Sequence, residues 1–170
     1  MSDGPRILIT GFGPFPGAPF NPTEPLVARL LQLRRPALSD VKIFGHVFQV
    51  TYEDVDRQLP LLLASHRPHA LLMFGLASRT SYVRIETRAR NAGSYLCNYL
   101  SWRAIEAARR DNGPRLVAFV HVPLLARARW YQDRGTPHRI SLEELVDAGE
   151  AMLLEMVKLA RQAVRSSASS

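Results

Sequence analysis

The stretch RILIT, residues 6–10, runs directly into GFGPFPG, residues 11–17. A short apolar run that ends in glycine and proline is typical of a buried strand followed by a loop. Helical periodicity then begins at Thr23, a predicted N-cap, and continues to residue 33. A buried strand that leads through a loop into a helix is the repeating unit of sheets with covering helices, so this stretch favours the α/β class.

The same alternation continues along the rest of the chain. Residues 51–66 begin with the capping spacing Thr51-x-x-Asp54, and residues 141–165 begin with a capping box at Ser141. The pattern predicts one α/β domain over residues 1–165, with a frayed tail over residues 166–170. The predicted strands are 41–50, 70–74, 81–91 and 116–122, and the further helices are 51–66, 97–112 and 141–165.

Composition narrows the class of protein. Of 170 residues, 46% are hydrophobic and 22% are charged, which is typical of a soluble globular domain. No apolar run approaches the roughly 20 residues that span a bilayer, and the N-terminus lacks an export signal, so we expect a cytoplasmic protein. The net charge of +7 leaves nucleic acid open as an alternative partner. However, the basic residues are scattered, and we expect neither nucleic acid nor membrane as a partner.

The glycine-rich loop is not a nucleotide-binding motif. Its spacing is GxGxxxG rather than GxGxxG, and Pro14 lacks the N–H that a phosphate needs. Phe12 and Phe15 suit an apolar ligand instead. The alternative is that both rings only close the end of the sheet.

Cys97 is the single cysteine, so the chain forms no internal disulfide. It stands where a helix is predicted to begin. Free N–H groups and the positive end of the helix dipole stabilise a thiolate there, and they also stabilise an oxyanion. Cys97 is therefore a candidate nucleophile, with a small buried core cysteine as the alternative.

A cysteine nucleophile needs a base and a group that orients the base. His121 ends a predicted buried strand, where ligands of open α/β sheets bind. The alternative is a strand histidine with a structural role. Glu86 lies on the polar face of its strand, where it either orients His121 or joins a surface ladder of salt bridges. The pattern around His66, His69 and His138 predicts that all three are solvated.

Four short blocks follow one another in a fixed order. They are ITGFGPF (9–15) with NPT (21–23), GLA (75–77) with IE (85–86) and AxN (89–91), AGSYLCN (92–98), and FVHVP (119–123). In these blocks and in their order, the chain resembles the pyroglutamyl peptidase I family of cysteine peptidases, also called pyrrolidone-carboxylate peptidases.

The resemblance implies an α/β/α sandwich, which is an open, mostly parallel twisted sheet with helices on both faces. It implies a catalytic triad of Cys97, His121 and Glu86 that removes an N-terminal pyroglutamyl residue from peptides through a thioester. Neither a metal nor an organic cofactor is implied. The expected partners are peptides with N-terminal pyroglutamate. A homo-oligomer is possible.

The resemblance also assigns a substrate pocket. Phe12 and Phe15 match the phenylalanines that hold the lactam ring. The third predicted pocket residue, Leu76, departs from the family pattern, because many members have glutamine where this chain has leucine. The resemblance therefore implies the type of reaction more strongly than it implies the preferred substrate.

A larger departure lies between Asn91 and Ala92, where the family has several tens of residues, including a helix and the strand that delivers the cysteine. Either the protein lacks this segment or the sequence omits it. Alternatively, the protein is a relative of the family that has the same fold but has lost or changed its activity. It would then bind small ligands or act as another thiol amidase.

Overall fold

The computed structural model describes residues 4–86, 95–126 and 139–168 of the chain. The described residues form five strands and four α-helices, with one short 3₁₀ helix at Pro36–Leu38. The strands are β1 (Arg6–Phe12), β2 (Lys42–Phe48), β3 (Ala70–Leu76), β4 (Arg84–Glu86) and β5 (Leu116–Val122). The helices are α1 (Thr23–Leu31), α2 (Tyr52–His66), α3 (Leu96–Ala108) and α4 (Leu142–Ala168).

The strands form one open sheet in the order β2-β1-β3-β5-β4. The first four are parallel, and β4 at the edge is antiparallel to β5. The register pairs Gly75 of β3 with His121 of β5, and Arg84 of β4 with the same His121. The predicted α/β class with an open, mostly parallel sheet is confirmed.

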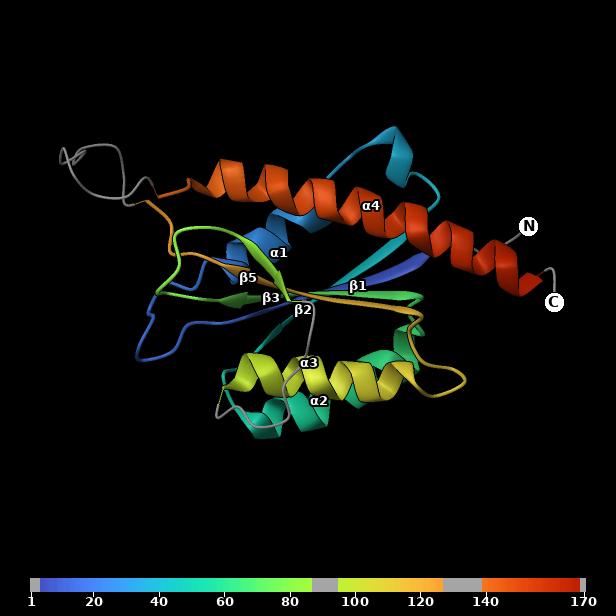
Figure 1. Ribbon diagram of the computed structural model, residues 1–170, viewed down its shortest axis with the longest axis horizontal. Helices are drawn as coiled ribbons and strands as arrows, with labels where there is room; N and C mark the ends of the chain where they lie inside the picture. Colours follow the sequence, from blue (N-terminus) through green and yellow to red (C-terminus); the bar gives the residue numbers. More distant parts are fainter. Residues whose placement is uncertain (1–3, 87–94, 127–138, 169–170) are drawn as a thin grey trace.

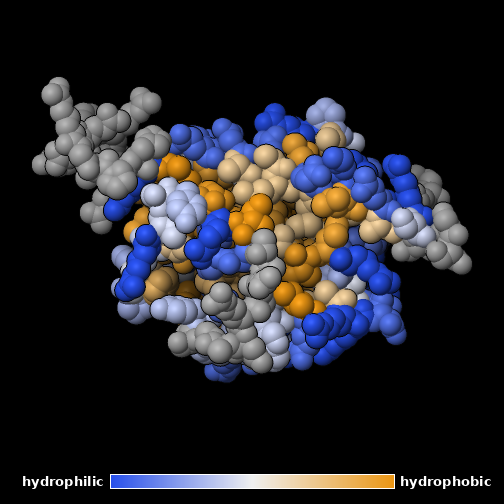
Figure 2. All heavy atoms as spheres, in the orientation of Figure 1, coloured by the Kyte–Doolittle hydropathy of each residue, from blue (hydrophilic) through white to orange (hydrophobic). Residues whose placement is uncertain are grey.

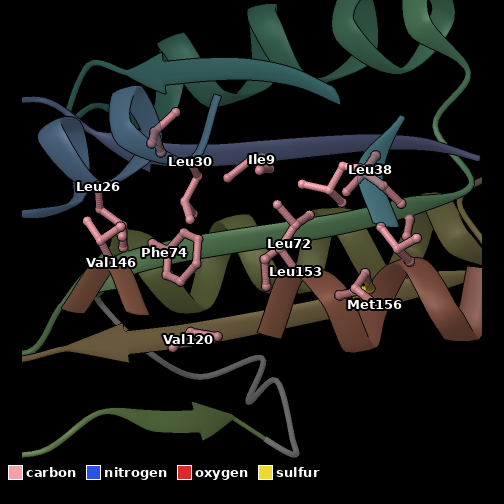
Figure 3. Packing of buried hydrophobic residues seen from close by; sticks show 14 of the residues in the cluster. Ile9, Leu26, Leu30, Leu38, Leu72, Phe74, Val120, Val146, Leu153 and Met156 are labelled. Carbon is pink, nitrogen blue, oxygen red and sulfur yellow. The ribbon is translucent and has the colours of Figure 1, made fainter. Parts of the chain in front are cut away.

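Helices cover both faces of the sheet, as the resemblance implied. In Figure 1, α1 and α4 lie above the sheet and α2 and α3 lie below it. Figure 3 shows the core on the α1/α4 side, where Leu72, Phe74 and Val120 point toward side chains of the two helices. Alternate residues of the same strands, such as Met73 and Phe119, pack on the opposite side against α3.

The predicted helix starts at residues 51 and 141 are confirmed by their hydrogen bonds. The N–H of Asp54 donates to Oγ1 of Thr51 at 3.2 Å. The N–H of Glu144 donates to Oγ of Ser141 at 3.2 Å, while the N–H of Ser141 donates to the Glu144 carboxylate at 2.7 Å. These reciprocal bonds satisfy donors that a helix start leaves unpaired.

Other expectations differ from the structure. The last helix is longer than predicted, because α4 continues through Ala168 and not only to residue 165; serine lowers helix propensity without stopping a helix as glycine or proline does. The predicted strand 81–91 is observed only as β4, and its residues from 87 onward lie outside the described residues. Of the three histidines predicted to be solvated, His138 lies outside the described residues, and His66 and His69 are not simply solvated. The ring of His66 stacks on Phe44 at 4.1 Å, and Nδ1 of His69 accepts from the N–H of Arg6.

Within the ranges described, the structure contains no helix that is both long and apolar enough to cross a membrane.

A polar pair, buried Thr10 and half-buried His46, lies across β1 and β2. Thr10 and His46 are neighbours in the register, and Oγ1 of Thr10 and Nε2 of His46 are buried without a hydrogen-bond partner in the described structure. Burial lowers the pKa of His46, against a smaller opposing effect of Asp54. The folded protein therefore holds this imidazole in its neutral form.

His46→Leu is expected to reduce the acid sensitivity of folding. As the pH falls through about 6.5, His46 takes up a proton more readily in the unfolded chain, so the free energy of unfolding decreases. Leucine removes this contribution and, because Nε2 has no partner, should change stability at neutral pH by no more than about 1 kcal/mol. Urea unfolding between about pH 5 and about pH 7 measures the slope. The control Thr10→Val should keep the wild-type slope, and an unchanged slope in His46→Leu would contradict the prediction.

Candidate active site

The loop after β1 is held in place by a buried hydrogen-bond network. The N–H of Phe12 donates to Oγ1 of Thr23 at 2.9 Å, and this hydroxyl donates back to the carbonyl of Phe12 at 3.0 Å. Nδ2 of Asn21 donates to the carbonyl of Gly13 at 3.1 Å. The predicted capping role of Thr23 is wrong, because Pro22 is the N-cap and the hydroxyl binds β1 instead. Asn21 and Thr23 thus fix the loop that contains the phenylalanines.

A pocket of about 400 Å³ opens between this loop and the end of β2. Phe15 lines it, opposite Val47 and Val50, whereas Phe12 is 3% exposed and packs against Phe48 with ring centroids 5.9 Å apart. The two phenylalanines therefore have different places, one at the pocket and one in the core beneath. The full lining is Gly13, Pro14, Phe15, Pro16, Val47, Phe48, Gln49, Val50 and Thr51.

His121 and Glu86 form a short contact at the edge of the sheet. Nδ1 of His121 lies 2.6 Å from Oε1 of Glu86, and their side chains are 15% and 25% exposed. Burial is the largest single effect on Glu86 and raises its pKa, but the hydrogen bonds and charge interactions with His121 and Arg84 together lower this pKa below its usual value. The carboxylate is thus the acceptor, and Nδ1–H of the histidine is the donor. This arrangement orients an imidazole as a base requires.

Cys97 is the second residue of α3, next to the same edge. It is half-buried, and its sulfur lies over Gly75, since a Cβ added to Gly75 would be 2.6 Å from Sγ. Gly75 is the cross-strand neighbour of His121, and paired residues of a sheet face the same side. The fold therefore brings Cys97, His121 and Glu86 to one side of one edge.

The protonation state of Cys97 differs from the sequence expectation. Burial, together with the negative charge of Glu86, raises the pKa of Cys97 to about 12, and its backbone N–H at the helix start opposes this only in part. The expected thiolate stabilised by the helix terminus is therefore wrong for this structure. The desolvation of the sulfur outweighs the helix terminus, so Cys97 is a neutral thiol near pH 7.

Leu76 is the last residue of β3 and is half-exposed. It pairs with Val122, and alternation along the strand turns it toward the side opposite to Gly75 and His121. Its role in the pocket stays a prediction. Among the described residues, no three His, Cys, Asp or Glu side chains are grouped closely enough to hold a metal ion.

Comparison with known proteins gives consistent matches. A family model described as pyroglutamyl peptidase matches residues 5–92. The pyrrolidone-carboxylate peptidase of Pyrococcus furiosus is 23% identical over 172 residues, covering 71% of this chain and 81% of the relative. The one of Vibrio vulnificus strain YJ016 is 30% identical over 138 residues, covering 80% of this chain and 63% of the relative.

Solved structures share the fold at low sequence identity. The pyrrolidone carboxyl peptidase from Thermococcus litoralis matches with a TM-score of 0.72 and 19% identity, covering 96% of each chain. The one from Fervidobacterium islandicum AW-1 matches with a TM-score of 0.74 and 17% identity, covering 91% of this chain and 99% of that structure.

The alignment with the Pyrococcus furiosus relative also measures the internal difference. It spans 172 positions, but 71% of the 170 residues of this chain, roughly 121, take part in it, so about 50 positions of the relative have no counterpart here. The family model stops matching at residue 92, where the sequence pattern indicated a missing segment.

Tyr82 and Ile85, beside and on β4, are 58% and 57% exposed. Figure 2 shows further hydrophobic residues between α3 and α4 on the side viewed.

Proposed function

Because this chain belongs to the pyroglutamyl peptidase family, we propose that it hydrolyses the bond after an N-terminal pyroglutamyl residue of peptides, with Cys97 as the nucleophile. His121 is the base in this proposal, and Glu86 orients it. The observation that supports it most is the 2.6 Å contact between Nδ1 of His121 and Oε1 of Glu86, beside a cysteine at a helix start. The proposed place of action is the cytoplasm.

The proposed reaction begins from a neutral thiol. The pKa of Cys97 is raised to about 12, so the S–H proton must pass to His121 as the sulfur attacks the pyroglutamyl carbonyl. Sγ forms a bond to the carbonyl carbon, and the proton then passes from His121 to the leaving amine as the C–N bond breaks. Water attacks the resulting thioester, its proton returns through His121 to the sulfur, and pyroglutamate leaves.

Two features of the chain assist this chemistry. Cys97 is the second residue of α3, so the N–H groups that a helix start leaves unpaired are proposed to stabilise the oxyanion. Phe15 is proposed as an apolar wall for the small neutral ring in the pocket of about 400 Å³, and Phe12 packs against Phe48 of the same lining. The residues that line this pocket do not include Cys97, His121 or Glu86. Leu76 is proposed as a further contact with substrate.

In a second candidate function, the protein has kept the fold of the family but has changed or lost its activity. Two observations favour it: the raised pKa of Cys97, and the roughly 50 positions of the Pyrococcus furiosus relative that have no counterpart here. Such a protein would bind small acyl or lactam compounds or cleave another amide through Cys97.

A panel of fluorogenic amides separates the two functions. We expect the pyroglutamyl amide to be hydrolysed with a kcat/KM at least about 100-fold above the prolyl and glutaminyl amides, because the pocket wall is apolar and the lactam is uncharged. His121→Gln should reduce this turnover by about 1,000-fold, as loss of the base would. Hydrolysis of another amide only, or binding of pyroglutamate without turnover, would instead support the second function.

A further inference from the structure

One oxygen of Glu86 is shared between two partners. Oε1 lies 2.6 Å from Nδ1 of His121 and 2.7 Å from both Nε and Nη2 of Arg84. Nη2 of Arg84 is also 3.5 Å from Nδ1 of His121. A guanidinium cation therefore lies beside both members of the proposed acid–base pair.

The geometry of β4 explains this placement. In the antiparallel register, Arg84 lies opposite His121 and Glu86 lies opposite Phe119. Residues two apart on a strand face the same side, so both charged side chains are directed to the side of His121. With 44% of its side chain exposed, Arg84 reaches Glu86 from the solvent side and not through the core.

The charge of Arg84 changes what Glu86 does to His121. A carboxylate beside an imidazole favours the protonated ring, which accepts no further proton. Because Cys97 is a neutral thiol, a protonated His121 would leave the site without a base. A cation 3.5 Å from Nδ1 opposes protonation of the ring, by a Coulomb effect of the same order and opposite sign.

We propose that Arg84 is a positioning residue that shares Glu86 with His121 and keeps the imidazole neutral, ready to accept the proton of Cys97. This rests on the proposed function, in which His121 is the base. Among the described residues, the charged or titratable groups facing His121 are Arg84 and Glu86 on β4 and Cys97 on α3; β3 contributes uncharged Gly75.

The test uses the pH dependence of the full-length protein. In Arg84→Gln, the pH at which the ring resonances of His121 change in NMR spectra should rise by about one pH unit. The midpoint of the acid side of the pH profile of kcat/KM should move to higher pH by the same amount. The value of kcat/KM should therefore fall roughly tenfold near pH 6 and stay unchanged on the alkaline plateau. Arg84→Lys should restore most of the wild-type profile, since it keeps the charge.

Two comparisons make the test decisive. Arg115→Gln removes the same charge at the opposite end of β5 and should leave both profiles unchanged. Arg84→Met provides a second neutral variant, and His121→Asn assigns the resonances. Unmoved His121 resonances in both neutral variants would overturn the role of Arg84, whether or not the protein is active. Absence of pyroglutamyl hydrolysis by the wild type would overturn the proposed function alone, because the NMR titration still decides the role of Arg84.

Discussion

Cys97→Ala is expected to lower kcat/KM for a pyroglutamyl amide by at least about 10,000-fold, since no other cysteine in the chain can replace the nucleophile. The sulfur lies against Gly75 next to the His121–Glu86 pair, so its removal takes away the atom that would form the thioester. Steady-state hydrolysis of the fluorogenic amide measures the loss, and intact mass after reaction with iodoacetamide reports whether the single thiol is modified.

The controls for this substitution use the same chain. Ser65→Ala removes one heavy atom at the exposed end of α2 and should keep full activity. In the wild type, iodoacetamide should modify Cys97 slowly at neutral pH and faster as the pH rises, because the raised pKa of Cys97 leaves little thiolate near pH 7. Turnover that survives in Cys97→Ala would disprove the nucleophile assignment.

Gly75→Ala is expected to displace the sulfur of Cys97 and to destabilise the protein. The new Cβ would lie 2.6 Å from Sγ of Cys97 and 2.7 Å from Cζ of Phe119, distances at which atoms must move apart. We expect stability to fall by about 1–3 kcal/mol, as for other overpacked cores. Displacement of the sulfur should also lower kcat/KM by about 100-fold or more. Urea unfolding and the amide assay measure the two effects.

A double-mutant cycle tests the cause. In the Cys97→Ala background one of the two clashing atoms is absent, so Gly75→Ala should cost about 1 kcal/mol less than in the wild type. Gly13→Ala is the matched control for stability, because its Cβ would meet nothing nearer than 3.7 Å. Equal costs of Gly75→Ala in both backgrounds would show that the sulfur does not lie where the structure puts it.

The proposed site also shows why an imidazole base matters more here than a preformed thiolate. The helix terminus at Cys97 contributes its N–H groups, but the sulfur is desolvated and Glu86 adds a negative charge nearby. Under these conditions proton transfer to His121 has to accompany attack, so anything that protonates His121 beforehand removes activity.

Much of the fold follows from the sequence because its signals are local. The apolar run 6–10, the Thr51–Asp54 cap and the Ser141–Glu144 capping box each depend on residues within one turn or strand, and all are observed. The start of α3 next to Cys97 is local in the same sense. The residue types in these patterns fix backbone hydrogen bonds almost regardless of what packs on them.

The tertiary structure alone decided the properties that depend on distant partners. Glu86 and His121 are 35 residues apart, and only the antiparallel placement of β4 showed that Oε1 of Glu86 is shared with Arg84. The hydroxyl of Thr23 bonds β1 instead of capping its own helix. The helix-start position of Cys97 was evident from the sequence, but its raised pKa was not, because desolvation and the charge of Glu86 arise only when sheet and helices close around the sulfur.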